Sequence, residues 1–171
     1  RMKIHFLNVG HGDCTVIEHA SGNLTMIDIN NGDDLDSWSA SEIAEETASP
    51  SDNLLLPFAE ALRLNRAGIL KEAGYDVSLT NPIQFLAHNY PGRPLFRYIQ
   101  SHPDLDHMRG LAALRNAGVS IGNFWDTHHS KTTEFISDSD ESDWTAYESL
   151  QAGRWNGTTH TVLRLGRGSS G

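Results

Sequence analysis

The chain opens with three short stretches that are apolar or that alternate apolar and polar residues, each bounded by turn residues. This pattern is typical of β-strands, and Ser21-Gly22-Asn23 is a hairpin turn signal between the second and third stretches. A similar pattern returns three times later in the chain. The strands that we predict span residues 3–9, 14–19, 24–29, 95–100, 119–125 and 159–165.

Apolar residues at helical spacing predict helices in the rest of the chain. Asn81 and Pro82 suit the cap and the first position of a short helix, and Gly118 suits the end of a longer one. The predicted helices span residues 54–73, 81–88, 107–117 and 141–152. A β-rich opening followed by alternating strands and helices indicates a mixed α/β (α+β) fold.

Residues 33–53 interrupt this pattern. They are polar, Ser-rich and acidic, which predicts a long loop or acidic insertion. The segment that follows, about 54–90, is expected to be a helical insertion. Because no internal repeat is found, we predict a single domain over residues 1–171 that carries both insertions.

Composition narrows the class of protein. The 171 residues suffice for one domain with a core, and 38% hydrophobic and 20% charged residues are ordinary for a globular protein. No apolar run approaches the ~18 residues that a membrane span needs, so we expect no membrane partner. The single cysteine, Cys14, cannot form an internal disulfide, which fits a small core residue and a cytoplasmic location.

The net charge of −9 is concentrated in two segments. Residues 30–53 hold seven acids and residues 134–148 hold six, and neither segment contains Lys or Arg. The remaining nine acids are outnumbered by 13 Lys and Arg residues, which leaves a formal charge of +4 elsewhere. The acidic segments are interpreted as solvated loops, and the overall charge does not exclude a nucleic-acid substrate.

The strongest chemical signal is His102-x-Asp104-x-Asp106-His107, directly after a predicted strand. Imidazole nitrogen and carboxylate oxygen are the usual non-thiol ligands of zinc, and they also suit manganese and iron. In an extended segment His102 and Asp104 point to the same side, and a following turn can direct the other two residues to a second ion. The alternative is that the two aspartates cap the next helix while the histidines lie on the surface.

This string resembles the His-x-His-x-Asp-His signature of the metallo-β-lactamase superfamily of binuclear hydrolases. Two further segments resemble the metallo-β-lactamase domain of bacterial DNA-uptake competence proteins. They are Phe6-Leu7-Asn8-Val9-Gly10-His11-Gly12-Asp13-Cys14 and Met26-Ile27-Asp28-Ile29-Asn30-Asn31-Gly32. The resemblance implies a metallo-β-lactamase αβ/βα sandwich and a metal-dependent phosphodiesterase or nuclease that activates water.

The resemblance also implies roles for individual residues. His102 and Asp104 would bind a first divalent ion, and Asp106 and His107 would bind a second. Asp106 and His107 would also be the catalytic residues. Asp106 would steer or deprotonate the water. Asp28 would not bind the ions itself but would hold the ligand loop in position. Zinc is the foremost candidate, and the aspartate in place of the second histidine favours manganese or magnesium beside it.

Other residues beside this string have two interpretations. His11 and Asp13 belong to the turn that should lie near the metals, where Asp13 serves a structural role or supports the site. Asp126 and His128 follow a later strand and either support the site or belong to a substrate loop. In that loop His128 would contact substrate or metal, and the alternative is a surface pair with His129. The tryptophans and the C-terminal arginines could meet bases and phosphates, or be core and surface residues; they are Trp125, Trp144, Trp155, Arg154, Arg164 and Arg167.

The family's domain is about twice this length and supplies further ligands from its second half. We therefore interpret the chain as the N-terminal half of that domain, which would leave one sheet face uncovered and would need a complementary C-terminal half as partner. Two alternative functions stay open. One is a latent nuclease or toxin activated by cleavage or by a partner, and the other is a non-catalytic binding module.

Overall fold

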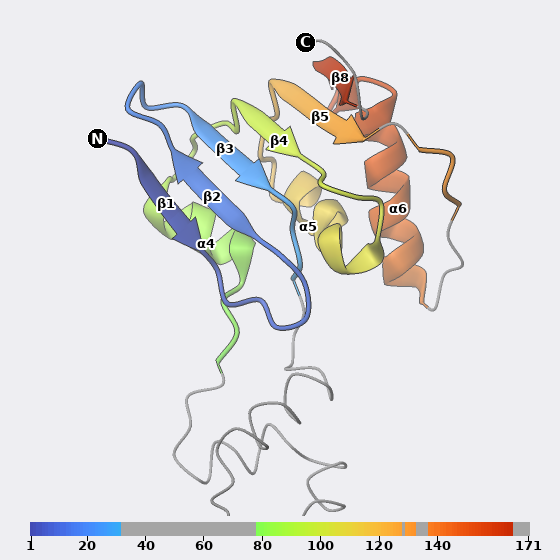
Figure 1. Ribbon diagram of the computed structural model, residues 1–171, viewed down its shortest axis with the longest axis horizontal. Helices are drawn as coiled ribbons and strands as arrows, with labels where there is room; N and C mark the ends of the chain where they lie inside the picture. The colour runs from blue at the N-terminus through green and yellow to red at the C-terminus, as the bar shows by residue number, and fades with distance from the viewer. Residues whose placement is uncertain (32–77, 128, 133–136, 166–171) are drawn as a thin grey trace, which may run out of the picture.

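A computed structural model describes residues 1–31, 78–127, 129–132 and 137–165. Its principal sheet has six strands in the order β1-β2-β3-β4-β5-β8. The strands are β1 (Lys3–Phe6), β2 (Thr15–Glu18), β3 (Leu24–Ile27), β4 (Arg97–Ile99), β5 (Asn123–Thr127) and β8 (Thr161–Leu165). The first three strands pair antiparallel, whereas β3, β4, β5 and β8 pair parallel, so the fold is mixed α/β (Figure 1).

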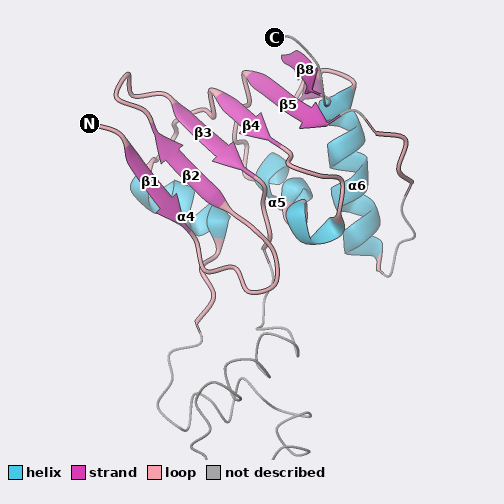
Figure 2. Cartoon of the chain, in the orientation of Figure 1, coloured by secondary structure: helices cyan, strands magenta, loops and turns pink. Residues whose placement is uncertain are grey.

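In the residues that the structure describes, three α-helices pack against this sheet (Figure 2). They are α4 (Pro82–Asn89), α5 (Leu111–Asn116) and α6 (Asp138–Gln151). The α4 cap is as the sequence predicts, because Asn81 Oδ1 accepts the backbone N–H groups of Ile83 and Gln84 at 3.0 Å, with Pro82 as the first helical residue. In the described residues, no helix is long and apolar enough to cross a membrane.

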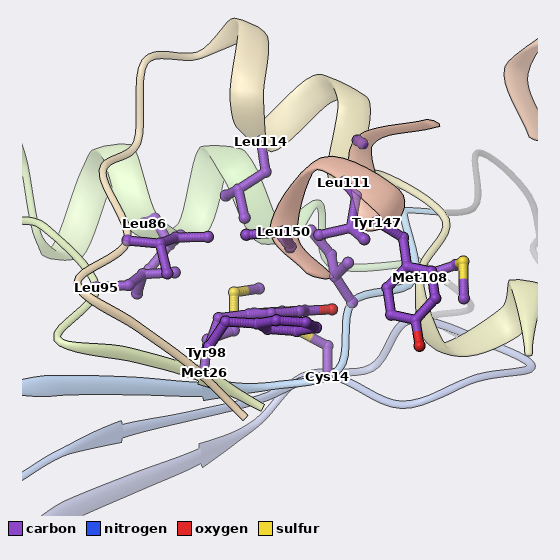
Figure 3. Close-up of a cluster of buried hydrophobic side chains, with 14 of the residues drawn as sticks. Cys14, Met26, Leu86, Leu95, Tyr98, Met108, Leu111, Leu114, Tyr147 and Leu150 are labelled. Carbon is purple, nitrogen blue, oxygen red and sulfur yellow. The ribbon is translucent and has the colours of Figure 1, made fainter. Parts of the chain in front are cut away.

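The core lies between the helices and one face of the sheet. The strand residues that line it are opposite one another along a single row, His5, Val16, Met26, Tyr98, Phe124 and Val162. Figure 3 shows Leu86, Leu114 and Leu150 from the helices lying over Tyr98 and Met26. Each fully buried leucine contributes about 1.5–3 kcal/mol to stability. Cys14 is 3% exposed, which confirms it as a core residue.

The opposite face of the sheet carries a second row of mostly apolar side chains. Strand register places Phe6, Thr15, Ile27, Ile99, Trp125 and Leu163 next to one another across all six strands. Phe6 is 82% exposed and Leu163 is 38% exposed. The guanidinium of Arg97 lies 3.6 Å from the centroid of the Trp125 ring. This apolar face is unusual for a sheet that meets only water.

The predicted helix over 107–117 is wrong at its beginning. A short 3-10 helix spans Leu105–His107, and α5 begins only at Leu111. Between them Gly110 has a φ of +107°, and a Cβ at this position would lie 2.7 Å from the Cβ of Asn31. The chain therefore turns where it approaches the β3 segment, and a regular helix cannot continue through that turn.

The predicted strand over 159–165 divides into two. β6 (Arg154–Trp155) and β7 (Thr158–Thr159) form a separate hairpin before β8. Its turn is Asn156-Gly157, and both residues have positive φ, which is the typical sequence of a tight hairpin. Trp155 and Trp144 are 1% and 8% exposed and belong to the core.

Several sequence predictions lie outside the described residues. They are the acidic insertion at 33–53, most of the helical insertion at 54–90, His128 and Arg167. The predicted helix over 141–152 is present and begins earlier, because Ser137 Oγ accepts the N–H of Asp140 and caps α6.

Candidate metal centre

The candidate residues gather where the parallel strands end. β3, β4 and β5 run in the same direction, so Asp28, the segment from Ser101 to His107, and Asp126 all lie near one edge of the sheet. β1 runs parallel to β3, which brings the turn with His11 and Asp13 to the same edge (Figure 1). Loops at such an edge commonly form binding sites.

Asp28 connects the segments at this edge through its hydrogen bonds to Ser101 and His107. It is 2% exposed, and its φ of +54° is a left-handed conformation that few residues except Asn, Asp and Gly adopt. Its Oδ1 accepts the N–H of Ser101 at 2.7 Å, and its Oδ2 accepts the Ser101 hydroxyl at 2.5 Å. The same Oδ2 lies 3.0 Å from Nδ1 of His107. Asp28 thus fixes both ends of the predicted ligand string.

His107 is buried and lies between carboxylates. On one side of its ring, Nδ1 faces Asp28 and lies 3.6 Å from Oδ2 of Asp13. On the other side, Nε2 lies 3.5 Å from Oδ2 of Asp106. The same Asp106 oxygen is 3.7 Å from Nε2 of His11. Carboxylates this close together repel one another, and a bound cation relieves that repulsion.

Donor atoms that could share one metal ion are close together here. In the part of the chain that the structure describes, Asp13, Asp28 and His107 form the one group of three or more such residues whose donor atoms all lie within 4.8 Å of one another. One imidazole nitrogen and two carboxylates fit a divalent cation such as zinc or manganese. Asp13 and Asp28 were expected from the sequence to support the site from outside the ligand string.

The four residues of the string itself are not gathered as closely. His102 is exposed, its Nδ1 lies 2.8 Å from the Ser101 hydroxyl, and its ring centroid is 3.6 Å from that of His107. Asp104 forms an ion pair with Lys131, whose ammonium also donates a hydrogen bond to the carboxylate. The hydrogen bond from Lys131 lowers the pKa of the Asp104 carboxyl. Asp104 precedes the 3-10 helix without capping it through its side chain, so the capping interpretation is wrong for this residue.

Asp126 does not join the candidate metal-binding group of Asp13, Asp28 and His107. It is 3% exposed, and it accepts hydrogen bonds from the Tyr147 hydroxyl at 2.9 Å and from Nε2 of Gln151 at 2.9 Å. Burial and the neighbouring Asp126 carboxylate raise the pKa of the Tyr147 hydroxyl. The Asp126 carboxylate thus contacts Tyr147 and Gln151 of α6, and its assignment to the supporting residues or the substrate loop stays a prediction.

Gly12 allows the two halves of the site to approach each other. Its φ is +138°, and a Cβ there would overlap the carbonyl oxygen of Asp106 and lie 2.8 Å from Asn30. Asn30 Nδ2 donates to the carbonyls of Val9 and His11 at 3.0 and 2.7 Å and so holds the turn in place. Gly-His-Gly-Asp is consequently a packing motif as well as a turn.

Sequence reasoning missed three residues of this region. Ser101 carries two of the hydrogen bonds to Asp28, and its place directly before the string could have indicated this. Lys131 pairs with Asp104 across 27 positions, and no local pattern indicates such a contact. Tyr147 contacts Asp126 from α6, and no local pattern indicates this contact.

No protein-family model matches the chain, and no curated protein matches it significantly. The proposals below therefore rest on the chemistry of the site and on the motif resemblance described above.

Proposed function

We propose that this protein is a metal-dependent hydrolase whose centre is built around His107. The observation that carries the proposal is the buried His107 ring, with Asp28 at Nδ1 and Asp106 at Nε2. A ligating histidine almost always donates its other ring N–H to a carboxylate or a carbonyl, which fixes the ring and raises its basicity. The Asp28–His107 pair has the distances of such an arrangement.

The proposed ligands are the residues of the string, with Asp28 behind them. Asp28 already accepts two hydrogen bonds from Ser101, so its third contact, to His107 Nδ1, is best used to orient the ring. This leaves Nε2 of His107 and the Asp106 carboxylate facing the same space. His102 and Asp104 are the other ligands proposed from the string. When bound, divalent cations supply Lewis acidity toward a phosphoryl oxygen and make water a better nucleophile at neutral pH.

Asp106 is the proposed proton acceptor for the attacking water. It is partly exposed, with 28% of its side-chain surface accessible, and therefore can meet both solvent and substrate. The nearby His11, 60% exposed at its side chain, is placed to contact a substrate oxygen. A phosphodiester is the proposed substrate because of the motif resemblance and because the chain outside its acidic segments carries a formal charge of +4.

The exposed apolar row of the sheet is suited to packing against a further layer. We propose that the six-stranded sheet is the N-terminal half of a metallo-β-lactamase sandwich, with the apolar row from Phe6 to Leu163 covered by a complementary half. The exposure of Phe6 and Leu163 supports this partner. It also supports the second candidate, a latent nuclease that becomes active when a partner or cleavage completes the fold.

The function is tested with metal-free protein prepared with EDTA. We expect added Mn²⁺ or Zn²⁺ to restore hydrolysis of bis(p-nitrophenyl) phosphate and of DNA, and EDTA to remove it again. Activity that appears only after limited proteolysis would favour the latent nuclease. Hydrolysis of carboxylic esters alone, with both phosphodiesters untouched, would contradict the phosphodiesterase proposal.

Two isosteric variants separate the possible ligand sets. If Asp28 orients His107, then Asp28→Asn should weaken metal binding about 10- to 100-fold, and Asp13→Asn should change it less than about threefold. The side chain of Asp13 is 72% exposed and can be replaced at little structural cost. Metal affinity is measured by isothermal titration calorimetry. A loss with Asp13→Asn as large as that with Asp28→Asn would instead assign the ion to the Asp13, Asp28 and His107 group.

A further inference from the structure

A cavity of about 250 Å³ lies beside the candidate centre, where β5 ends against α6 and β8. Its lining residues come from these three elements and from the segment after β5. They are Thr127, His129, Lys131, Thr132, Trp144, Glu148, Gln151 and Arg164. The cavity thus opens at the same edge of the sheet as Asp28 and His107, but it is formed by other residues.

The cavity carries two permanent cationic side chains, Lys131 and Arg164. The one carboxylate among its lining residues is Glu148, which accepts a hydrogen bond from Nε1 of Trp144 at 3.1 Å. Two threonines add hydroxyl groups. This combination of cations and neutral donors is suited to a phosphate group, for which Lys acts as a point charge and Arg as a planar donor.

A partly buried hydrogen-bond network supports the cavity wall. Nδ1 of His129 accepts the backbone N–H of Lys131 at 3.0 Å, so its Nε2–H is directed to the Tyr147 hydroxyl, 2.5 Å away. Tyr147 in turn donates to the buried carboxylate of Asp126. Gln151 also donates to this carboxylate, at 2.9 Å. The backbone that carries Lys131 is therefore positioned from the core, and the cost of ordering it for a ligand is reduced.

Lys131 connects the cavity to the ligand string, because its ammonium pairs with Asp104. The side chains of Lys131 and Asp104 are 44% and 43% exposed. An ion pair this accessible to water is weak, and Lys131 can exchange Asp104 for another anion. A substrate with one phosphate at the His107 centre can therefore place a neighbouring phosphate against Lys131 and Arg164.

We propose that this cavity is a second phosphate subsite, and that the substrate is consequently a polynucleotide strand rather than an ester with a single phosphate. The inference rests on the proposed function, since it assigns a neighbouring subsite to the same reaction. A strand bound across both positions presents successive phosphates to Asp106 and His107 and to the cation pair. Recognition through phosphates alone predicts little preference for base sequence.

The test is binding in EDTA, which separates strand binding from cleavage. The probe is a fluorescein-labelled oligothymidylate of about 12 nucleotides, followed by fluorescence anisotropy. Lys131→Gln and Arg164→Gln should each weaken binding about three- to tenfold, and each should lower the slope of log K against log salt by about 0.7. Arg154→Gln, a matched exposed arginine on β6, should leave both values unchanged.

Wild-type affinity in both cavity variants, no detectable binding by the wild type, or an equal loss in Arg154→Gln would overturn the subsite. Hydrolysis of bis(p-nitrophenyl) phosphate distinguishes this failure from failure of the proposed function. That compound carries one phosphate and needs only the His107 centre, so its metal-dependent hydrolysis by the wild-type protein tests the proposed function whatever the oligothymidylate assay gives.

Discussion

Replacement of His107 by alanine should lower metal-dependent phosphodiester hydrolysis by about 1000-fold or more. His107 is the residue that connects the two sides of the site, because its ring nitrogens face Asp28 and Asp106 at 3.0 and 3.5 Å. Its removal takes away a proposed ligand and also leaves the buried Asp28 carboxylate without one of its partners. The measurement is the initial rate with bis(p-nitrophenyl) phosphate at saturating Mn²⁺.

The matched control is His88→Ala, since His88 is exposed on α4. This variant should keep the wild-type rate. Because His107 is buried, circular dichroism and thermal unfolding must accompany the assay. A second variant, Asp106→Asn, changes a partly exposed carboxylate and should also lose most of the activity while it unfolds like the wild type. A folded His107→Ala protein with the wild-type rate would remove His107 from the reaction.

Replacement of Gly12 by alanine should lower the free energy of unfolding by about 3 kcal/mol and weaken metal binding at the same time. Two costs add here. The φ of +138° is strained for any residue with a side chain, and the new methyl group would overlap the backbone carbonyl of Asp106. Backbone cannot rotate away as a flexible side chain can, so the turn with His11 and Asp13 must move away from the ligand string.

Gly92→Ala separates the cost of the positive φ from the cost of the overlap with Asp106. Gly92 also has a positive φ, +68°, but nothing lies within 4 Å of a Cβ built at that position. This variant should lose only about 1–2 kcal/mol of stability and keep its metal affinity. The free energy of unfolding of both variants is measured by urea denaturation. Equal losses of stability in the two variants would mean that the contact between Gly12 and Asp106 contributes little.

The sequence was informative wherever a single element determines the structure. Apolar and alternating stretches predicted the approximate positions of the six strands, although β5 begins at Asn123, four residues later than predicted. Asn81-Pro82 predicted how α4 begins, because caps depend on neighbouring residues only. Mixed α/β class followed from the order of those elements. Asn156-Gly157 is itself a typical hairpin sequence. The alternating residues over 159–165 predicted one strand there, and so the β6–β7 hairpin was missed.

What the sequence could not supply depends on contacts between distant segments. Gly110 interrupts the predicted helix because it approaches Asn31, which is 79 positions earlier in the chain. The string from His102 to His107 was evident as a candidate, yet its acidic neighbours in space, Asp13 and Asp28, come from two other loops. Lys131 and Tyr147 reach the region through side-chain contacts that only the packing of α6 and the β5 segment determines.

The most direct test of the metal centre is calorimetric titration of Zn²⁺ or Mn²⁺ into metal-free wild-type protein and into folded His107→Ala. We predict saturable binding to the wild type and an affinity at least about 100-fold lower in the variant, since a lost ligand should cost at least as much as a lost orienting partner. Indistinguishable isotherms for the two proteins, or no binding to the wild type, would contradict a metal centre built around His107.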